Sequence, residues 1–116
     1  MKLLFKLLIS ITMLIVAANA QTIKVGTNAT YPPFEFVNEQ NQITGFDMDL
    51  MAEIAKKVGF KFEIVNISFD SLIPALKAGK IDIIAAAMSA TPERLKAVDF
   101  SKPYYHTMNL FIKRAD

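Results

Sequence analysis

The sequence predicts an α/β fold in which helices flank a largely parallel sheet. Strand-like and helix-like patterns alternate between Ile23 and Val98, an order typical of parallel strands joined by right-handed crossovers. The run Ile81–Ala87 is apolar except at Asp82, as in a strand that is covered on both faces. Glycines follow two of the helical patterns, where a chain commonly leaves a helix.

The first predicted elements are two short strands. Residues Ile23–Thr27 alternate between apolar and polar side chains, as a strand does. Pro32 and Pro33 then predict a turn, because they fix φ and lack a backbone donor. A second strand is expected at Phe34–Val37, and the polar stretch Asn38–Gln42 is expected to turn the chain as part of a hairpin.

The next element is a helix that is expected to begin at Asp47, whose carboxylate can cap it. Gly59 is expected to end the helix in a left-handed conformation. Its predicted apolar face has helical spacing and consists of Met51, Ile54, Ala55 and Val58.

A strand and a second helix follow. Residues 60–64 alternate as a half-buried strand does, and residues 69–76 return to helical spacing. Gly79 is expected to end this helix, in which Pro74 is tolerable only within or next to the first turn.

The last predicted elements are a strand, a short helix and a final strand. The strand is the apolar run Ile81–Ala87. Thr91-Pro92-Glu93 then combines a hydroxyl cap, a proline at the first helical position and an early acid, which predicts a helix start. Residues 109–112 are expected to form the final strand.

Residues 1–20 have the pattern of a signal peptide. Lys2 and Lys6 precede the apolar run Leu7–Ala18, and Ala18-Asn19-Ala20 forms an A-x-A cleavage site. The run has 12 residues, whereas a membrane-spanning helix needs about 20. We therefore expect cleavage before Gln21. Since no cysteine is available for a lipid anchor, a free protein in the periplasm is expected.

Composition excludes several functional classes. The chain has 116 residues, too few for a multidomain enzyme. Removing Lys2 and Lys6 from its 13 basic residues leaves 11, which balance the 11 acidic ones. Such a neutral remainder has no electrostatic footprint for nucleic acid.

Candidate catalytic and metal-binding groups are few. His106 is the single histidine and has no nucleophile motif around it, so an ordinary structural role is expected. Asp47, Asp49 and Glu53 are better explained as a helix cap and a solvated face than as a cation site. We predict no catalytic residue, no metal site and no cofactor.

Three loops, each following a predicted strand, carry the candidate binding residues. In an open parallel sheet, ligands bind beyond the carboxyl ends of the strands, so these loops are expected to meet at one rim. The first loop carries Asn28 and Tyr31, the second carries Phe69, and the third carries Met88, Ser89 and Arg94.

The residue types at this rim favour a zwitterionic ligand. The rings of Tyr31 and Phe69 could form a slot for a flat or aliphatic group. Arg94 lies in the first turn of a capped helix, where its guanidinium and free backbone N–H groups suit a carboxylate. The alternative is that Phe69 belongs to the core and Arg94 pairs with a surface acid.

Five collinear motifs resemble the family 3 periplasmic solute-binding proteins, the polar amino-acid receptors of ABC importers. Among these, the chain looks most like the arginine or basic amino-acid receptors. The motifs are Gly26–Glu35, Gly45–Leu50, Phe69–Leu76, Met88–Arg94 and Asp99–Tyr105.

The resemblance implies a two-lobed fold of the type II binding-protein class that closes around its ligand without catalysis. Residues 21–116 would form the N-terminal part of lobe 1, and the second lobe would be missing. An inner-membrane ABC permease is the implied partner, and a monomer is expected. One lobe cannot enclose a ligand, so weak binding is expected. A sensory receptor domain and a dehydratase-type enzyme are alternatives on the same scaffold.

The resemblance also implies roles for individual residues. Tyr31 and Phe69 match rings that sandwich the ligand side chain, and the Ala87 carbonyl matches an acceptor for the α-amino group, with Met88 beside it. Ser89 and Arg94 match the partners of the α-carboxylate. Asn28 stands where receptors for cationic side chains often have aspartate, so the ligand is not restricted to arginine or lysine.

Overall fold

The computed structural model of the chain describes residues 22–108 and 110–115. The predicted signal peptide and its cleavage site lie outside the described residues. Among the described residues, no helix is long and apolar enough to cross a membrane.

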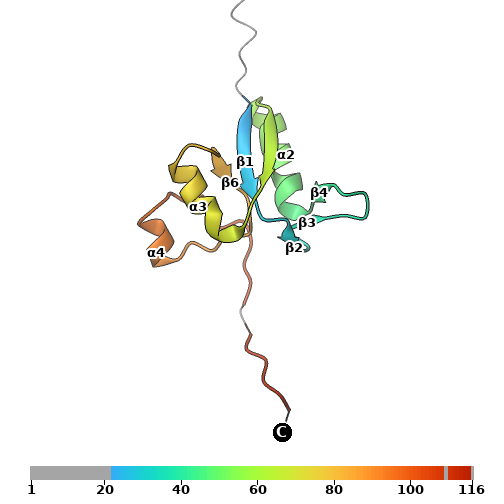
Figure 1. Cartoon of the computed structure of the whole chain (residues 1–116), viewed down its shortest axis with the longest axis vertical. Coiled ribbons are helices and arrows are strands. Elements are labelled where there is room, and N and C mark those ends of the chain that lie inside the picture. The colour runs from blue at the N-terminus through green and yellow to red at the C-terminus, as the bar shows by residue number, and fades with distance from the viewer. Residues whose placement is uncertain (1–21, 109, 116) are drawn as a thin grey trace, which may run out of the picture.

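The centre of the fold is a parallel sheet with the strand order β5-β1-β6 (Figure 1). Strand β1 (Ile23–Thr27) pairs along its whole length with β5 (Phe62–Asn66) and, on its other edge, with β6 (Ile83–Ile84). This arrangement confirms the predicted parallel sheet. Strand β6 is much shorter than the predicted run 81–87, although the backbone N–H groups of Asp82 and Ala85, on either side of it, still donate to the Lys24 and Gly26 carbonyl oxygens of β1.

Two helices, α2 (Phe46–Val58) and α3 (Phe69–Lys77), cover opposite faces of the sheet. Neighbouring residues of a strand point to opposite faces, and Val25 packs with the residues of α2, whereas the position of Gly26 faces Leu72 of α3. The core on the α2 side contains Val25, Met48, Met51 and Ala85, and the core on the α3 side contains Leu72, Ile81 and Ala86.

A second, antiparallel sheet extends from the start of α2. It consists of β2 (Thr30–Tyr31), β3 (Glu35–Val37) and β4 (Ile43–Thr44). The predicted hairpin turn at residues 38–42 is confirmed between β3 and β4. Strands β2 and β4 each have two residues, which is too short for a periodic pattern, so they were not predicted.

The apolar face of α2 differs from the predicted one. Met51 and Ala55 are buried as expected, but Val58 is 71% exposed and Ile54 is 39% exposed. Met48 is buried together with Met51 and Ala55, so the buried face of the helix follows the spacing i, i+3, i+7 from Met48.

Two predictions for the second half of the chain are also corrected. Pro74 lies inside α3, beyond its first turn, rather than at the start of the helix. The strand expected at residues 109–112 is absent from the part of this range that the structure describes. Phe111 and Ile112 are almost fully exposed, so no neighbouring strand covers them.

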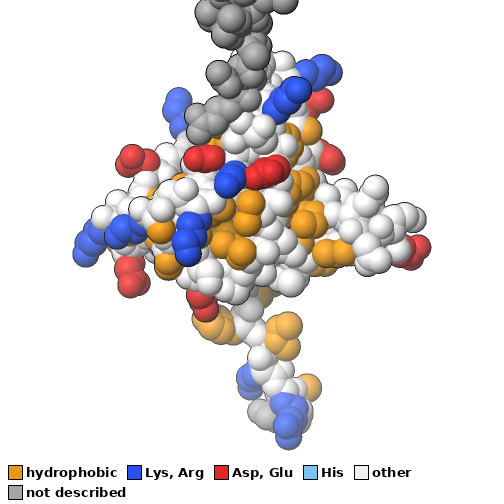
Figure 2. Space-filling model, turned by 45° about the horizontal axis from the view of Figure 1, so that its top comes forward, with side chains coloured by type: hydrophobic (Ala, Val, Ile, Leu, Met, Phe, Trp, Pro, Cys, Tyr) orange, Lys and Arg blue, Asp and Glu red, His pale blue; other side chains and the backbone are white. Residues whose placement is uncertain are grey.

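The short helix α4 (Pro92–Leu95) begins as predicted, with Thr91 as its cap. Beyond it, the chain passes the strand ends and runs away from the lobe (Figure 1). On the face shown in Figure 2, charged side chains of both signs are scattered around apolar ones. This mixture agrees with the balanced charge of the sequence.

An added methyl group at Gly26 can test how tightly the side chains pack against β1. A Cβ at Gly26 would collide with Cδ1 of Ile81, which is fully buried. We expect Gly26→Ala to lower the free energy of unfolding by about 1–3 kcal/mol, as overpacking does, measured by urea denaturation.

The double variant Gly26→Ala/Ile81→Val is the control for this prediction. Ile81→Val removes the colliding methyl group, so the two changes should be less destabilising together than the sum of their separate effects. Additive effects would show that the contact does not limit this position.

Candidate functional site

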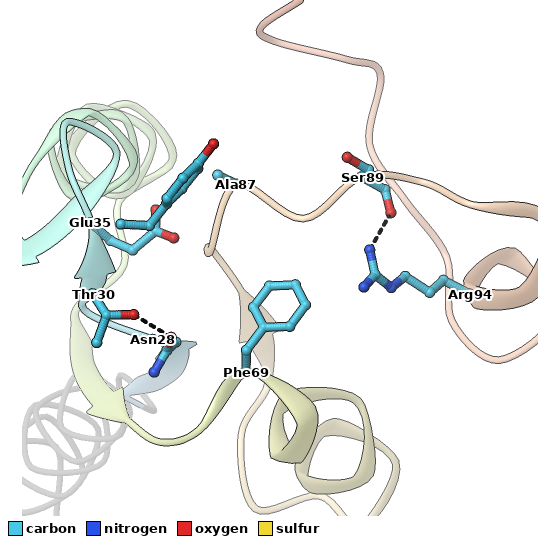
Figure 3. A pocket seen from close by; sticks show the side chains of 8 residues that line it. Asn28, Thr30, Glu35, Phe69, Ala87, Ser89 and Arg94 are labelled. Carbon is cyan, nitrogen blue, oxygen red and sulfur yellow. Dashed lines mark hydrogen bonds between the residues drawn. The ribbon is translucent and has the colours of Figure 1, made fainter. Parts of the chain in front are cut away.

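A hollow of about 330 Å³ opens at the edge of the parallel sheet where its strands end (Figure 3). Side chains from β2, β3, α3, α4 and the segments after β1 and β6 converge on it. It is lined by Asn28, Thr30, Tyr31, Glu35, Phe69, Ala87, Ser89 and Arg94.

The parallel register explains why distant residues meet here. Asn28 follows β1, Phe69 follows β5 as the first residue of α3, and Ala87 follows β6. Six of the seven predicted site residues therefore line one hollow, as the rule for carboxyl strand ends predicts. The exception is Met88, whose side chain packs against the core on the α3 side.

Arg94 forms one end of the hollow. Its guanidinium carbon lies 5.1 Å from the centre of the Phe69 ring, and Nη1 donates to the Ser89 carbonyl oxygen at 3.1 Å. Thr91 Oγ1 accepts from the Arg94 backbone N–H at 3.3 Å, which starts the helix and fixes the base of this side chain. The alternative pairing of Arg94 with a surface acid is not seen among residues 22–108 and 110–115.

Glu35 lies at the opposite side of the hollow from Arg94, with Phe69 between them (Figure 3). It is 1% exposed, and its Oε2 has no hydrogen-bond partner within the described chain. Burial, together with the neighbouring Asp47 carboxylate, raises the pKa of Glu35 to about 8. Near neutral pH this buried carboxyl group therefore holds its proton.

The sequence patterns did not predict Glu35 as a site residue. The available signal is an acid between Phe34 and Phe36 in a strand-like segment. Strand β3 pairs Glu35 with Tyr31 of β2, and this pairing brings the carboxyl group to the hollow.

The side chain of Asn28 is engaged within the protein. Its Nδ2 donates to the Ile67 carbonyl oxygen at 3.1 Å, and its Oδ1 accepts from Thr30 Oγ1 at 2.7 Å. These bonds tie the loop after β1 to the loop after β5, so Asn28 has a clear role in shaping the hollow.

Tyr31 belongs to a row of aromatic rings at the mouth of the hollow. It is 54% exposed and stacks on Phe34, with 5.5 Å between ring centres. Phe34 in turn meets the edge of Tyr105 at 4.9 Å, which anchors the segment after α4 to the lobe.

Asp47 is buried and does not cap its own helix, contrary to the prediction. The cap position is Gly45, and the first N–H groups of α2 donate to the Pro33 and Phe34 carbonyl oxygens. The Oδ2 atom of Asp47 instead accepts from the Ala87 backbone N–H at 2.6 Å and from the Tyr104 hydroxyl at 2.9 Å.

The environment of Asp47 also affects Tyr104. Burial, followed by hydrogen bonding to the Asp47 carboxylate, raises the pKa of Tyr104. Its hydroxyl therefore stays protonated and serves as a donor.

No group of three or more potential metal ligands occurs in the described residues, and His106 is exposed and does not line the hollow.

Comparison with known proteins identifies the family. Residues 23–116 match the model of the bacterial extracellular solute-binding proteins, family 3. The chain belongs to this family. The resemblance drawn from the five sequence motifs is thus confirmed.

Several relatives within the family carry the names of amino-acid receptors. A probable histidine-binding protein of Campylobacter jejuni is 58% identical over 92 residues, which are 79% of this chain and 36% of the relative. The ABC transporter arginine-binding protein 1 of Escherichia coli is 43% identical over 100 residues, covering 86% of this chain and 41% of the relative.

A solved structure shows the same fold. The arginine-bound form of domain 1 from TmArgBP is 50% identical, with a TM-score of 0.71, and the match covers 72% of this chain and 67% of that domain. The architecture is therefore that of a single lobe of a solute-binding protein. The chain spans about two fifths or less of the length of the curated relatives above.

The raised pKa of Glu35 predicts how stability depends on pH. Between about pH 4.5 and pH 8, the folded solute-binding lobe keeps a proton on Glu35 that the unfolded chain releases. The free energy of unfolding should therefore fall as the pH rises through this window. Glu35→Gln should flatten this dependence in urea denaturation series.

Glu63→Gln is the matched control, since Glu63 is an exposed acid on β5. It should leave the pH profile as it is in the parent protein. A parent profile that rises over the whole window would contradict the protonated state of Glu35.

Proposed function

We propose that this chain binds an amino acid, with a preference for a cationic side chain, as the receptor component of an ABC importer. Binding requires no bond making or breaking. The observation that carries the proposal is the arrangement of Arg94, Phe69 and Glu35 along one hollow (Figure 3).

The Arg94 end suits the α-carboxylate of the ligand. A guanidinium offers a fixed fork of donors that matches a carboxylate in geometry and charge. The contacts of Arg94 with Phe69 and Ser89 hold this fork at the hollow. The Ser89 backbone and hydroxyl groups lie beside it as further polar partners.

The opposite end suits a cationic group. Glu35 is buried beside Asp47 at this end, so a cation there would meet an acidic group in a poorly solvated place. Such a cation would favour ionisation of Glu35. Phe69 and Tyr31 provide apolar surface for the stem between the two charged ends.

The names of similar proteins support the same ligand class. Relatives are named for histidine or arginine, and the solved domain 1 from TmArgBP holds arginine. That structure is a single domain bound to arginine, which supports the proposal that one lobe can hold a ligand. Enclosure by a second lobe, hinge closure and delivery to a periplasm-facing permease complete the proposed cycle, as the resemblance implies.

Calorimetric titration with arginine, lysine, histidine, glutamine and glutamate tests the proposal. We expect heat of binding with cationic amino acids and little with glutamate. Arg94→Ala should abolish binding, because the carboxylate loses its charged partner, and Tyr31→Ala should weaken it by about 1–3 kcal/mol through lost ring contact.

Arg94→Lys is the matched control for this prediction, since it keeps the charge but loses the planar fork. Its affinity should lie between those of the parent and Arg94→Ala. A well-folded parent that gives no heat with any of the five amino acids would refute the proposed function.

Binding of a cationic amino acid should also release a proton. Glu35 is protonated near pH 7, and a cation beside it lowers its pKa, so up to about one proton per bound ligand should leave. The release is measured from binding heats in buffers with different ionisation enthalpies.

Two comparisons make the proton measurement specific. Glu35→Gln should bind with no proton release, and a neutral amino acid such as glutamine should release none from the parent. Equal proton release in Glu35→Gln would place the titrating group elsewhere.

A further inference from the structure

The peptide at Ala87 is held in an unusual conformation at the hollow. Ala87 has φ of 44°, in the left-handed region that L-residues other than glycine and asparagine seldom adopt. It is also one of the residues that line the hollow (Figure 3). A strained backbone at such a place persists only where its surroundings fix it.

Asp47 supplies the fixing contact. Its Oδ2 accepts from the Ala87 N–H at 2.6 Å, across 40 positions of sequence. The carboxylate is 1% exposed, so water competes little for this charge-assisted hydrogen bond. Asp47 does not itself line the hollow, so it can affect a ligand only through a lining residue, either Ala87 or Glu35, whose pKa it helps to raise.

The same oxygen atom also holds the segment that follows α4. Tyr104 donates its hydroxyl to Asp47 Oδ2 at 2.9 Å. One carboxylate in the first turn of α2 therefore joins three parts of the chain that the sequence separates widely. These parts are the start of α2, the loop after β6 and the segment that leaves the lobe.

We propose that Asp47 is a positioning residue, whose bond to the Ala87 N–H holds the Ala87 peptide at the hollow, where the family resemblance implies that its carbonyl oxygen accepts from the α-amino group of the ligand. The effect on the ligand rests on the proposed function, whereas the hydrogen bond between Asp47 and Ala87 does not depend on it. Asp47 touches no ligand atom. Its positioning role acts through the loop after β6 and is separate from its effect on the pKa of Glu35.

The test compares two ligands that differ by one group. L-arginine carries the α-amino group, whereas 5-guanidinopentanoate has the same carboxylate and guanidinium without it. Asp47→Ala should weaken arginine binding about ten- to hundredfold, the range expected for a lost hydrogen bond to a charged group. Both ligands are compared in a Glu35→Gln background, where loss of Asp47 cannot alter the ionisation of Glu35, and the affinity for 5-guanidinopentanoate should change there by less than about threefold.

Three further variants separate positioning from general damage. Asp47→Asn should keep arginine affinity within about threefold, because the amide oxygen can accept from the Ala87 N–H. Adding Ala87→Gly to Asp47→Ala should raise the arginine affinity at least about threefold, since glycine adopts positive φ readily. Asp49→Asn, on the exposed side of the same helix turn, should match the parent.

A spectroscopic measurement tests the bond without any ligand. The Ala87 amide proton should resonate far downfield in the parent and in Asp49→Asn, and should move upfield in Asp47→Ala. If the parent binds no amino acid but this shift is seen, the proposed function fails while the bond is upheld.

Other outcomes would overturn the positioning role. Equal weakening of both ligands by Asp47→Ala would do so, as would a loss in Asp47→Asn as large as that in Asp47→Ala. If Asp47→Ala does not fold, Tyr104→Phe and Asp47→Asn remain. In Tyr104→Phe, the Ala87 amide proton should still resonate far downfield. Loss of this downfield shift in Tyr104→Phe would also overturn the positioning role of Asp47.

Discussion

The parallel register of three strands determines where everything else in this lobe can lie. Strand β1 pairs with β5 and β6 in the same direction, so all three strands end at one edge. The loops that follow these strands therefore lie together at this edge. Burial on both faces of the sheet, against α2 and α3, holds the strands in this register, and the absence of a side chain at Gly26 lets Ile81 and Leu72 pack closely against β1.

The hollow at this edge is organised by charge as much as by shape. Arg94 lies at one end, the buried acid Glu35 lies at the other, and the Phe69 ring lies between them. This order matches the proposed ligand, an amino acid with a cationic side chain. Burying Glu35 beside Asp47 is costly for two negative charges, which is why one proton remains on the pair. In the proposed function, a ligand cation replaces that proton, so the energetic cost of the buried acid would become a source of selectivity.

The segment after α4 is attached to the lobe by two tyrosines. Tyr104 and Tyr105 attach it to Asp47 and Phe34, respectively. Beyond them, Met108, Leu110, Phe111 and Ile112 expose most of their apolar surface. Exposed apolar surface of this kind marks a place where another surface can pack.

The sequence by itself determined the local elements and the place of the site. The alternation in Ile23–Thr27 and the Thr91 cap depend on neighbouring residues alone, and the meeting of Phe69, Ala87 and Arg94 follows from strand direction. Only the tertiary structure decided the roles of Asp47 and Glu35. An acid early in a helix looks like a cap in the sequence, and its true partners lie 40 and 57 positions away. Such partners are chosen by how the layers pack, because burial makes a distant hydrogen bond worth more than a local one in water.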